Sequence, residues 1–337
     1  MTQKDPKLLI QPGPQLRQQM TTPVVMRDVW YALTPATLAG IWFFGLGAFL
    51  VLLACIAGAV LVEWYFAPEE KRGYFIGDGT AILTGWLLGL TLPPALPLWM
   101  AFLGGVVAVG IGKTIWGGMG ANIFNPALVG RAFLLATFPI AMTTWTAPGD
   151  FFSIPSSLFA LPLMTGVVDT VTQASPLGMM KFEHIDTPFI DLLFGNTSGS
   201  LGETSGLLLI LGGIYLWWRR DLDWRIPVGI IGTAIIFSLI LFMVDADKYP
   251  GPIFTVFSGG MLLGAIFMAT DPVTSPLTRK GTWIFAIGIG LLVVLIRVFG
   301  GFPEGIMYAI LLMNAATPLI DMYTQPRVFG RELDQNE

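Results

Sequence analysis

The sequence predicts an all-α polytopic membrane protein with about ten transmembrane helices, and three observations lead to that prediction. Of the 337 residues, 12% are charged and 54% are hydrophobic, whereas soluble domains carry roughly 25% charged residues. A soluble fold of this length has too little interior to bury so much apolar surface. Apolar runs of about 18 to 25 residues, the length that crosses a bilayer as a helix, recur along the chain. Lysine and arginine are also distributed unevenly among the polar segments between these runs.

The apolar runs define the expected spans in chain order. A first group of five occupies residues 29–141, with spans at 29–45, 47–67, 79–92, 96–115 and 123–141. The third span is short because Pro93 and Pro94 must end a helix. A second group of five occupies residues 206–324, with spans at 206–219, 226–245, 252–270, 282–299 and 304–322. Three polar segments remain, namely 1–28, 325–337 and the long segment 142–205 between the two groups.

The positions of lysine and arginine predict which side of the membrane each segment faces. If the N-terminus is cytoplasmic, fourteen of these residues fall on the cytoplasmic side, three fall outside and Arg131 lies within the fifth span. Such an excess marks the cytoplasmic side, so both termini are expected in the cytoplasm and segment 142–205 outside. The cytoplasmic residues are Lys4, Lys7, Arg17, Arg27, Lys71, Arg72, Lys113, Arg219, Arg220, Arg225, Arg279, Lys280, Arg327 and Arg331, and the outer ones are Lys181, Lys248 and Arg297.

The two groups of spans resemble one another in sequence. The segment "LTLPPALPL" after the third span matches "ATDPVTSPL" after the eighth at four positions, and "GGMGANIFNPALVG" occupies the same relative place as "GGFPEGIMYAILLM". Four shared residues also arise by chance in proline-rich turns. A true repeat of five helices would be inverted, because an odd number of spans reverses the second copy, and inverted repeats are common in transporters.

Several polar residues near the fifth span have both a structural and a ligand-binding interpretation. Asn122 and Asn125 offer amide groups to a polar ring edge, but they also suit a helix cap, which is the favoured interpretation for Asn125 before Pro126. Arg131 lies about six residues, or roughly 9 Å, into the helix. A charge at that depth needs a partner or must extend to the surface. Proline-broken segments similarly require a partner for their free backbone groups.

The outer segment contains two stretches rich in hydroxyl groups. "VDTVTQASPLG", residues 168–178, on its own has the composition of a polar loop. "GNTSGSLGETSG" precedes the sixth span, and Ser200 with Glu203 fits a capping box for that helix. A helix N-terminus with a glycine-rich lead-in also suits an anion, and capping and phosphate binding are compatible there.

Four segments together resemble a known family. "GGMGANIFNPALVGRAFLLATFP", "GSLGETS", "ATDPVTSPLTRKG" and "RVFGGFPEGIMYAILLMNAATPLIDMYTQPRVFG" are similar to the D subunit of the Rnf ion-translocating ferredoxin:NAD oxidoreductase complex. The B subunit of the sodium-translocating NADH:quinone oxidoreductase is its sibling. The resemblance covers residues 29 to 331, and the chain ends soon after "PRVFG", which suits the Rnf protein better.

The resemblance implies a flavin mononucleotide (FMN) joined through its phosphate to a hydroxyl side chain of the outer segment. On the family's pattern the acceptor is Ser175, with Asp169, Thr172, Gln173 and Ala174 before it. Gln173 stands where glycine is usual and Ser175 where threonine is usual, although serine offers the same nucleophilic oxygen. A separate flavin transferase must attach the group, because a free hydroxyl attacks phosphate too slowly. Ser200, Glu203 and Thr204 are further candidates for flavin binding.

The resemblance also implies a noncovalent riboflavin in the membrane part, for which Asn122, Asn125, Arg131 and the proline-broken segments are candidates. The expected function is electron transfer between ferredoxin and NAD within a multisubunit complex, coupled to Na⁺ or H⁺ transport across the bacterial cytoplasmic membrane. The expected partners are the other membrane and iron–sulfur subunits, and no nucleic acid.

Other features of the sequence limit what this chain does alone. With one cysteine, Cys55, and one histidine, His184, it cannot build a Cys/His metal cluster, and it has no dinucleotide fingerprint following a strand. Two alternatives remain at this point. The first is a redox-free secondary transporter or channel with the same repeat, and the second is a passive membrane anchor for a redox partner.

Overall fold

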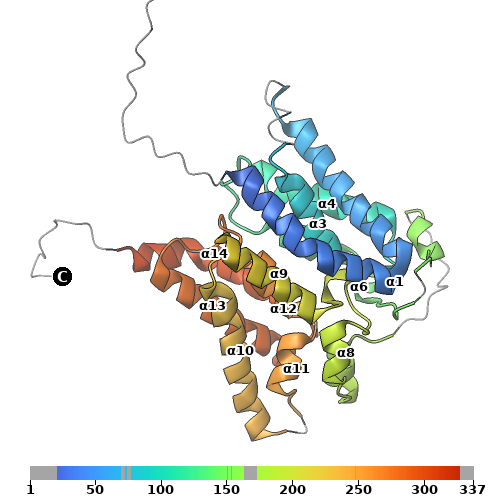
Figure 1. Cartoon of the computed structure of the whole chain (residues 1–337), viewed down its shortest axis with the longest axis vertical. Helices are drawn as coiled ribbons and strands as arrows, with labels where there is room; N and C mark the ends of the chain where they lie inside the picture. Colours follow the sequence, from blue (N-terminus) through green and yellow to red (C-terminus); the bar gives the residue numbers. More distant parts are fainter. Residues whose placement is uncertain are drawn as a thin grey trace, which may run out of the picture.

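The computed structural model describes residues 21–69, 73, 77–149, 151–152, 154–162, 173–246 and 248–326 (Figure 1). In that part of the chain the regular structure is helical, and it contains no β-strand. Five helices are long and apolar enough to cross a membrane, namely Thr22–Phe66, Leu98–Trp116, Arg225–Val244, Arg279–Phe299 and Ile306–Thr324. The prediction of an all-α membrane protein is therefore confirmed.

The first long helix, α1 (Thr22–Phe66), is broken at Gly45, whose φ of 77° and ψ of −169° are not helical. Figure 1 shows the chain turning back within α1, so that its two helical stretches meet beside the label. The break leaves backbone groups unpaired, and segment 142–205, named the outer segment after its expected side of the membrane, satisfies two of them. Leu46 N–H donates to the Phe151 carbonyl at 3.0 Å, and Gly149 N–H donates to the Phe43 carbonyl at 2.9 Å. The break lies between the expected spans 29–45 and 47–67.

The rest of the first half contains α3 (Thr80–Leu90), α4 (Leu98–Gly112), α5 (Pro126–Thr137) and α6 (Pro139–Thr143). As expected, the helix before Pro93 and Pro94 ends early, at Leu90. The expected span 123–141 is wrong as a continuous helix, because the chain bends at Phe138 (φ −127°, ψ 58°). Pro139 follows directly, and a proline disfavours the helical conformation in the residue before it.

The second half contains α9 (Gly206–Arg219), α10 (Arg225–Val244), α11 (Pro252–Phe257), α12 (Met261–Leu263), a π-helix (Gly264–Met268), α13 (Arg279–Phe299) and α14 (Ile306–Thr324). The expected span 252–270 is therefore interrupted. Ser258 is extended and Gly259 has a φ of 62°, a conformation that glycine adopts at little cost. The sequence analysis missed this break, although the Gly259–Gly260 pair could have indicated it.

The outer segment contributes only short elements in its described residues. They are a 3₁₀ turn (Ser156–Phe159), α7 (Pro176–Gly178), a π-helix (Met179–Glu183), α8 (Phe189–Phe194) and a 3₁₀ turn (Leu201–Glu203). Ser157 Oγ donates to the Ala95 carbonyl at 3.1 Å, which ties the first turn to the break between α3 and α4.

Each half has its own helix packing. In the first half α1 packs on α3 and α4, and α4 packs on α5, whereas in the second half α10 packs on α13 and α13 on α14. Small residues permit close contacts in the first half, because a Cβ on Gly105 of α4 would lie 2.2 Å from the Cys55 carbonyl of α1. Contacts of α1 with α9 and of α5 with α14 join the halves.

Candidate functional site

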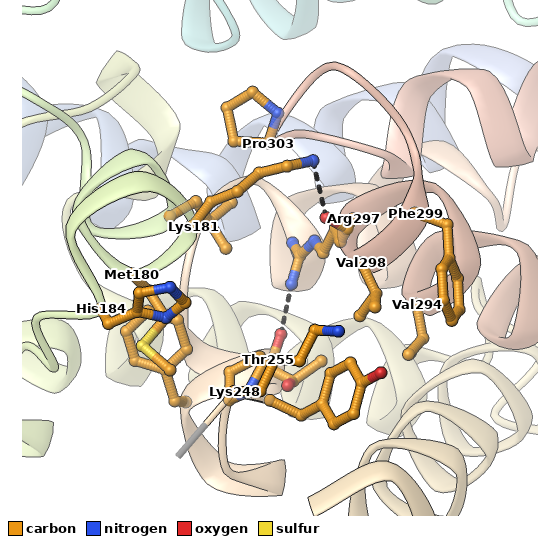
Figure 2. A pocket seen from close by; sticks show the side chains of 14 residues that line it. Met180, Lys181, His184, Lys248, Thr255, Val294, Arg297, Val298, Phe299 and Pro303 are labelled. Atoms are coloured by element: carbon orange, nitrogen blue, oxygen red, sulfur yellow. Dashed lines mark hydrogen bonds between the residues drawn. The ribbon is translucent and has the colours of Figure 1, made fainter. Parts of the chain in front are cut away.

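Three cavities lie between these elements. The first, of about 320 Å³, is lined by Ser175 and Arg131. The second, of about 120 Å³, is lined by Asn122 and Asn125. The third, of about 370 Å³, surrounds the end of the Arg297 side chain and is drawn in Figure 2. Two of the cavities therefore contain residues that the sequence had singled out.

Ser175 is held firmly by the backbone around it. It precedes Pro176, whose fixed φ suits the first position of a helix, and its Oγ accepts the Gly178 N–H at 3.2 Å as the N-cap of α7. The side chain is buried, at 4% exposure. One residue earlier, the Ala174 carbonyl accepts a hydrogen bond from Ser198 Oγ at 2.6 Å. The two hydroxyl-rich stretches of the outer segment therefore meet here.

The cavity beside Ser175 combines residues from both halves of the molecule. α5 and α6 contribute one wall, and the loop 301–304 with α14 contributes another. Ser175 and Ala174 lie on the wall formed by the outer segment. The remaining lining is largely apolar and aromatic, with Trp145, Phe182, Phe302 and Tyr308.

Arg131 has a partner at this cavity rather than reaching the surface. Its guanidinium is buried and forms an ion pair with Glu304, which lies in the loop before α14. Both residues line the Ser175 cavity. The sequence had not indicated Glu304, although it lies in the "GGFPEG" stretch that precedes α14. The pair joins the first half to the second across 173 residues of chain.

Four other predicted residues of this segment, Gln173, Ser200, Glu203 and Thr204, are described by the structure and do not line the cavity. Gln173 is exposed, and its N–H donates to the Trp145 carbonyl at 3.1 Å. Asp169 and Thr172 fall outside the described residues.

The expected capping box at the sixth span is wrong. Ser205 is the N-cap of α9, and its Oγ accepts the Leu208 N–H at 3.4 Å. Ser200 instead precedes the 3₁₀ turn Leu201–Glu203, which the chain inserts before α9. Thr204 is buried, and its Oγ1 donates to the Leu201 carbonyl at 3.2 Å within that turn. Ser200 and Ser205 are both residue types that cap helices. Because the 3₁₀ turn lies between Ser200 and α9, Ser205 is the residue next to the helix start.

Glu203 belongs to a group of charges close to the Arg131–Glu304 pair. Burial, and to a smaller extent the charge of Glu304, raises the pKa of the Glu203 carboxyl to about 7 against the opposing effect of Arg131. Several buried polar atoms in this region have no hydrogen-bond partner among the described residues. They are Glu203 Oε1, Ser258 Oγ, Arg297 Nε and Glu304 Oε1.

Asn125 is a helix cap, as its sequence context predicted. Its Oδ1 accepts the N–H groups of Ala127 at 3.0 Å and Leu128 at 3.4 Å, and Pro126 opens α5. Its Nδ2 donates to the Met268 carbonyl of the second half at 3.0 Å, so the same side chain also joins the halves. Asn122 Nδ2 donates to the Phe124 carbonyl at 3.2 Å.

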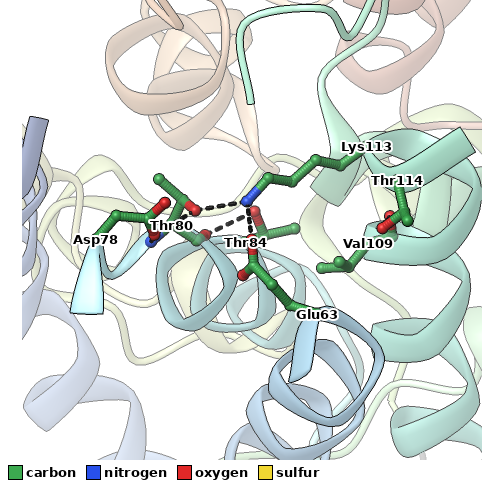
Figure 3. A network of polar contacts seen from close by, with 7 residues as sticks. All are labelled: Glu63, Asp78, Thr80, Thr84, Val109, Lys113 and Thr114. Carbon is green, nitrogen blue, oxygen red and sulfur yellow. Dashed lines mark hydrogen bonds and ion pairs between the residues drawn. The ribbon is translucent and has the colours of Figure 1, made fainter. Parts of the chain in front are cut away.

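A buried ionic network borders the cavity of Asn122 and Asn125 (Figure 3). Lys113 is 4% exposed. Its Nζ pairs with Glu63 of α1 and donates to Thr80 Oγ1 at 2.6 Å. The Thr80 hydroxyl in turn donates to Asp78 Oδ1 at 2.7 Å. From the sequence Lys113 had counted simply as a cytoplasmic charge, since its partner is 50 residues away.

The chain resembles proteins of one family over nearly its whole length. The model of the NQR2, RnfD, RnfE family matches residues 9–330. The D subunit of the proton-translocating ferredoxin:NAD(+) oxidoreductase complex of Clostridium ljungdahlii is 41% identical over 95% of this chain and 96% of its own. The D subunit of the Na(+)-translocating ferredoxin:NAD(+) oxidoreductase complex of Acetobacterium woodii is 39% identical over 96% of this chain and 95% of its own.

A third relative is the D subunit of the ion-translocating oxidoreductase complex of Stutzerimonas stutzeri, 42% identical over 91% of this chain and 92% of its own. The range matched by the family model includes α1, Ser175 and α14. The chain belongs to the NQR2, RnfD, RnfE family.

Proposed function

We propose that this chain is the D-type membrane component of a redox-driven ion pump, in which FMN joined to Ser175 carries electrons between ferredoxin and NAD. The relatives named as subunits of ferredoxin:NAD oxidoreductase complexes support the reaction. The observation that carries the flavin assignment is the position of Ser175 on the wall of a cavity lined by aromatic side chains and Arg131.

The lining of this cavity suits a flavin. Its volume of about 320 Å³ lies within the range of roughly 300 to 1,000 Å³ that small-molecule pockets usually have. Trp145, Phe182 and Tyr308 provide flat apolar surface for an aromatic ring system. Arg131 provides positive charge for a phosphate group, because a guanidinium binds phosphate oxygens well. Bound there, a flavin would accept and release electrons one or two at a time.

The residues of this chain have defined tasks in that proposal. Ser175 would hold the group by a phosphoester at its Oγ. The flavin transferase would make this bond from a flavin dinucleotide, whose P–O–P bond breaks so that a nucleoside monophosphate leaves and the serine proton is released. Pro176 and the Gly178 N–H fix the direction of the Ser175 side chain. The aromatic walls exclude water from the ring. Because Ser175 is buried in the folded chain, the flavin transferase acts before the outer segment has packed.

We assign the noncovalent riboflavin to the cavity of Asn122 and Asn125. The polar lining, which includes Lys113 and Asp271, offers donors and acceptors to a ring edge. However, its volume of about 120 Å³ is well below the usual range for small-molecule pockets. Asn125 also uses both ends of its amide in the protein. Riboflavin therefore enters only if the two halves move apart at this place.

We further assign ten spans in two inverted repeats, with both termini in the cytoplasm of a bacterial membrane and the outer segment outside. The same order of contacts in the two halves supports the repeat: α4 packs on α1 and α5, and α13 packs on α10 and α14. Each half also buries one cation at the end of its fourth span, Lys113 after α4 and Arg297 near the end of α13.

Ion coupling requires an element whose conformation depends on the redox state. The contacts between the halves, Arg131 with Glu304 and Asn125 with Met268, are suited to that role because they border the two proposed flavin cavities. The transported ion is Na⁺ or H⁺, and relatives of nearly equal identity are named for each. The other membrane and iron–sulfur subunits supply the remaining electron carriers.

The flavin assignment is tested by co-expressing the chain with a flavin transferase and illuminating a denaturing gel. We expect a fluorescent band for the wild type and none for Ser175→Ala, because the variant lacks the acceptor oxygen. Ser157→Ala is the matched control, since it removes a serine hydroxyl of the same segment that bonds to the Ala95 carbonyl and does not line this cavity. A dark wild-type band, with a transferase that labels a known substrate, would favour the redox-free transporter, whose main support is the broken α11–α12 region.

A further inference from the structure

The cavity in Figure 2 lies outside both proposed flavin sites. It is enclosed by the π-helix Met179–Glu183, the turn at residues 248–250, α11 and the last turns of α13. Its volume, about 370 Å³, is the largest of the three described here. It therefore has room for part of a ligand, and its lining indicates which kind.

The charge of the lining is entirely positive. Lys181, Lys248 and Arg297 line the cavity together with His184, and none of the fourteen lining residues is aspartate or glutamate. Glu203 and Glu304 attract Arg297 electrostatically but do not line the cavity. A site with several cations and no acid on its walls favours an anion.

Two of these cations are fixed in place by the protein. Arg297 is 93% buried, and its guanidinium donates to the carbonyls of Thr255 at 2.6 Å and Ser258 at 3.0 Å. Its Nε has no hydrogen-bond partner among the described residues. Lys181 Nζ donates to three carbonyls at the end of α13, those of Arg297 at 2.9 Å, Gly300 at 2.5 Å and Phe302 at 3.2 Å. These contacts prevent either cation from moving away from the cavity.

Lys248 differs because it is exposed at the edge of the cavity. Its ammonium lies 5.4 Å from the centre of the Tyr249 ring. A lysine on an exposed turn can reorient toward a ligand at little cost, since its long side chain is flexible. Lys248 is therefore the cation that a ligand would recruit, and also the one that can be changed without disturbing buried contacts.

The remaining walls are apolar, and further exposed apolar residues lie beside them. Leu177, Met180, Phe254, Val294, Val298 and Phe299 line the cavity. Phe299 is 66% exposed. Val244 on α10 (76%) and Ile253 on α11 (60%) are also exposed. These residues stand at the ends of their helices, next to the turn that carries Lys248. Cations at the ends of membrane helices can bind the anionic headgroup of a lipid, while the apolar surface next to them contacts its acyl chains.

We propose that this cavity binds an anionic phospholipid from the outer leaflet, with its phosphate among Lys248, Lys181 and Arg297 and an acyl chain along Phe254 and Phe299. The site lies against the π-helix that follows Ser175, because Met180 and Lys181 line this cavity while Phe182 lines the cavity of Ser175. A bound lipid therefore stabilises the segment that carries Ser175. The site does not depend on flavin attachment.

The test measures the melting temperature of the purified full chain in a neutral detergent during titration with phosphatidylglycerol, phosphatidylcholine or inorganic phosphate. We expect phosphatidylglycerol to stabilise the protein at a concentration at least tenfold lower than phosphatidylcholine. Lys248→Glu should raise the half-saturating concentration at least fivefold. Lys280→Glu is the matched control, because it reverses an exposed charge at the opposite end of α13 and should leave that concentration unchanged.

Three results would overturn the proposal. Equal effects of the two lipids would show that the headgroup charge is not recognised. Stabilisation by inorganic phosphate as effective as that by phosphatidylglycerol would indicate a site for the free anion, without the acyl chain. If Lys248→Glu binds phosphatidylglycerol normally but releases another protein from the assembled complex, the cavity is a protein interface.

Discussion

At the scale of single residues, the carboxyl of Glu203 lies in an environment that differs clearly from water. Burial raises its pKa from 4.5 to about 7, with Glu304 adding to the shift and Arg131 opposing it. A raised pKa means that the folded protein binds the proton more tightly than the unfolded chain. The resulting stability is complete below about pH 4.5 and is lost as the pH rises through about 7.

We therefore predict that Glu203→Gln makes stability less dependent on pH between 4.5 and 8. At about 1.4 kcal/mol per pKa unit, the ionised carboxylate costs on the order of 3 kcal/mol at pH 8, and glutamine avoids that cost. Melting curves of the full chain at pH 5 and pH 8 measure the effect, with exposed Glu183→Gln as the control. A variant that loses as much stability as the wild type on going to pH 8 would contradict the prediction.

The residue-level prediction that was confirmed, the cap at Asn125, depends on a local interaction. The Asn125 cap uses only the N–H groups two and three residues later, so a short stretch of sequence is enough to predict it. Arg131 needed a partner, but that partner is 173 residues distant, and no local pattern specifies it. Ser200 failed as a cap for α9 because Ser205 offered an equivalent hydroxyl nearer the helix start. The role of Ser175 rests on the proposed flavin chemistry and stays a prediction.

At the scale of secondary-structure elements, breaks within apolar runs set the architecture. The sequence predicted the break of α1 because 45 residues of helix are about twice what a bilayer needs, and it predicted the end of α3 from two prolines. It missed the bends at Phe138 and Gly259. Hydropathy continues unchanged through both places, and it carries no information on backbone dihedral angles.

The break of α1 gives a second prediction. Gly45 has dihedral angles that are almost exclusive to glycine, and forcing another residue into them costs roughly 1–3 kcal/mol. We expect Gly45→Ala to lower the melting temperature by several degrees. Gly232→Ala is the control, because that glycine lies within α10 and a Cβ there would meet no atom within 4 Å. Alanine is the better helix former, so this change should leave stability equal or slightly higher.

Equal melting temperatures for Gly45→Ala and the wild type would mean that the chain does not need this conformation. The hydrogen bonds from Leu46 and Gly149 across the break would then have to form with other backbone angles.

At the scale of the whole molecule, the sequence predicted the membrane class because composition is a property of the entire chain. It could not predict how the halves meet, since those contacts join Arg131 with Glu304 and Asn125 with Met268 across long separations. The proposed flavin cavities both lie at such junctions, and each is lined by residues of the two halves. The prediction of sidedness is independent of these contacts and can be tested separately.

With ten spans, three of them separate Asn196 from Lys280, so the two residues must lie on opposite sides of the membrane. Both are exposed, whereas the single native cysteine, Cys55, is buried and provides an unlabelled background. We expect a membrane-impermeant maleimide to label Asn196→Cys in intact cells. Lys280→Cys should react only after the membrane is opened, because the excess of lysine and arginine places it in the cytoplasm. Labelling of both in intact cells would mean an even number of crossings between them, and the inverted repeat could not then be built from three spans in this interval.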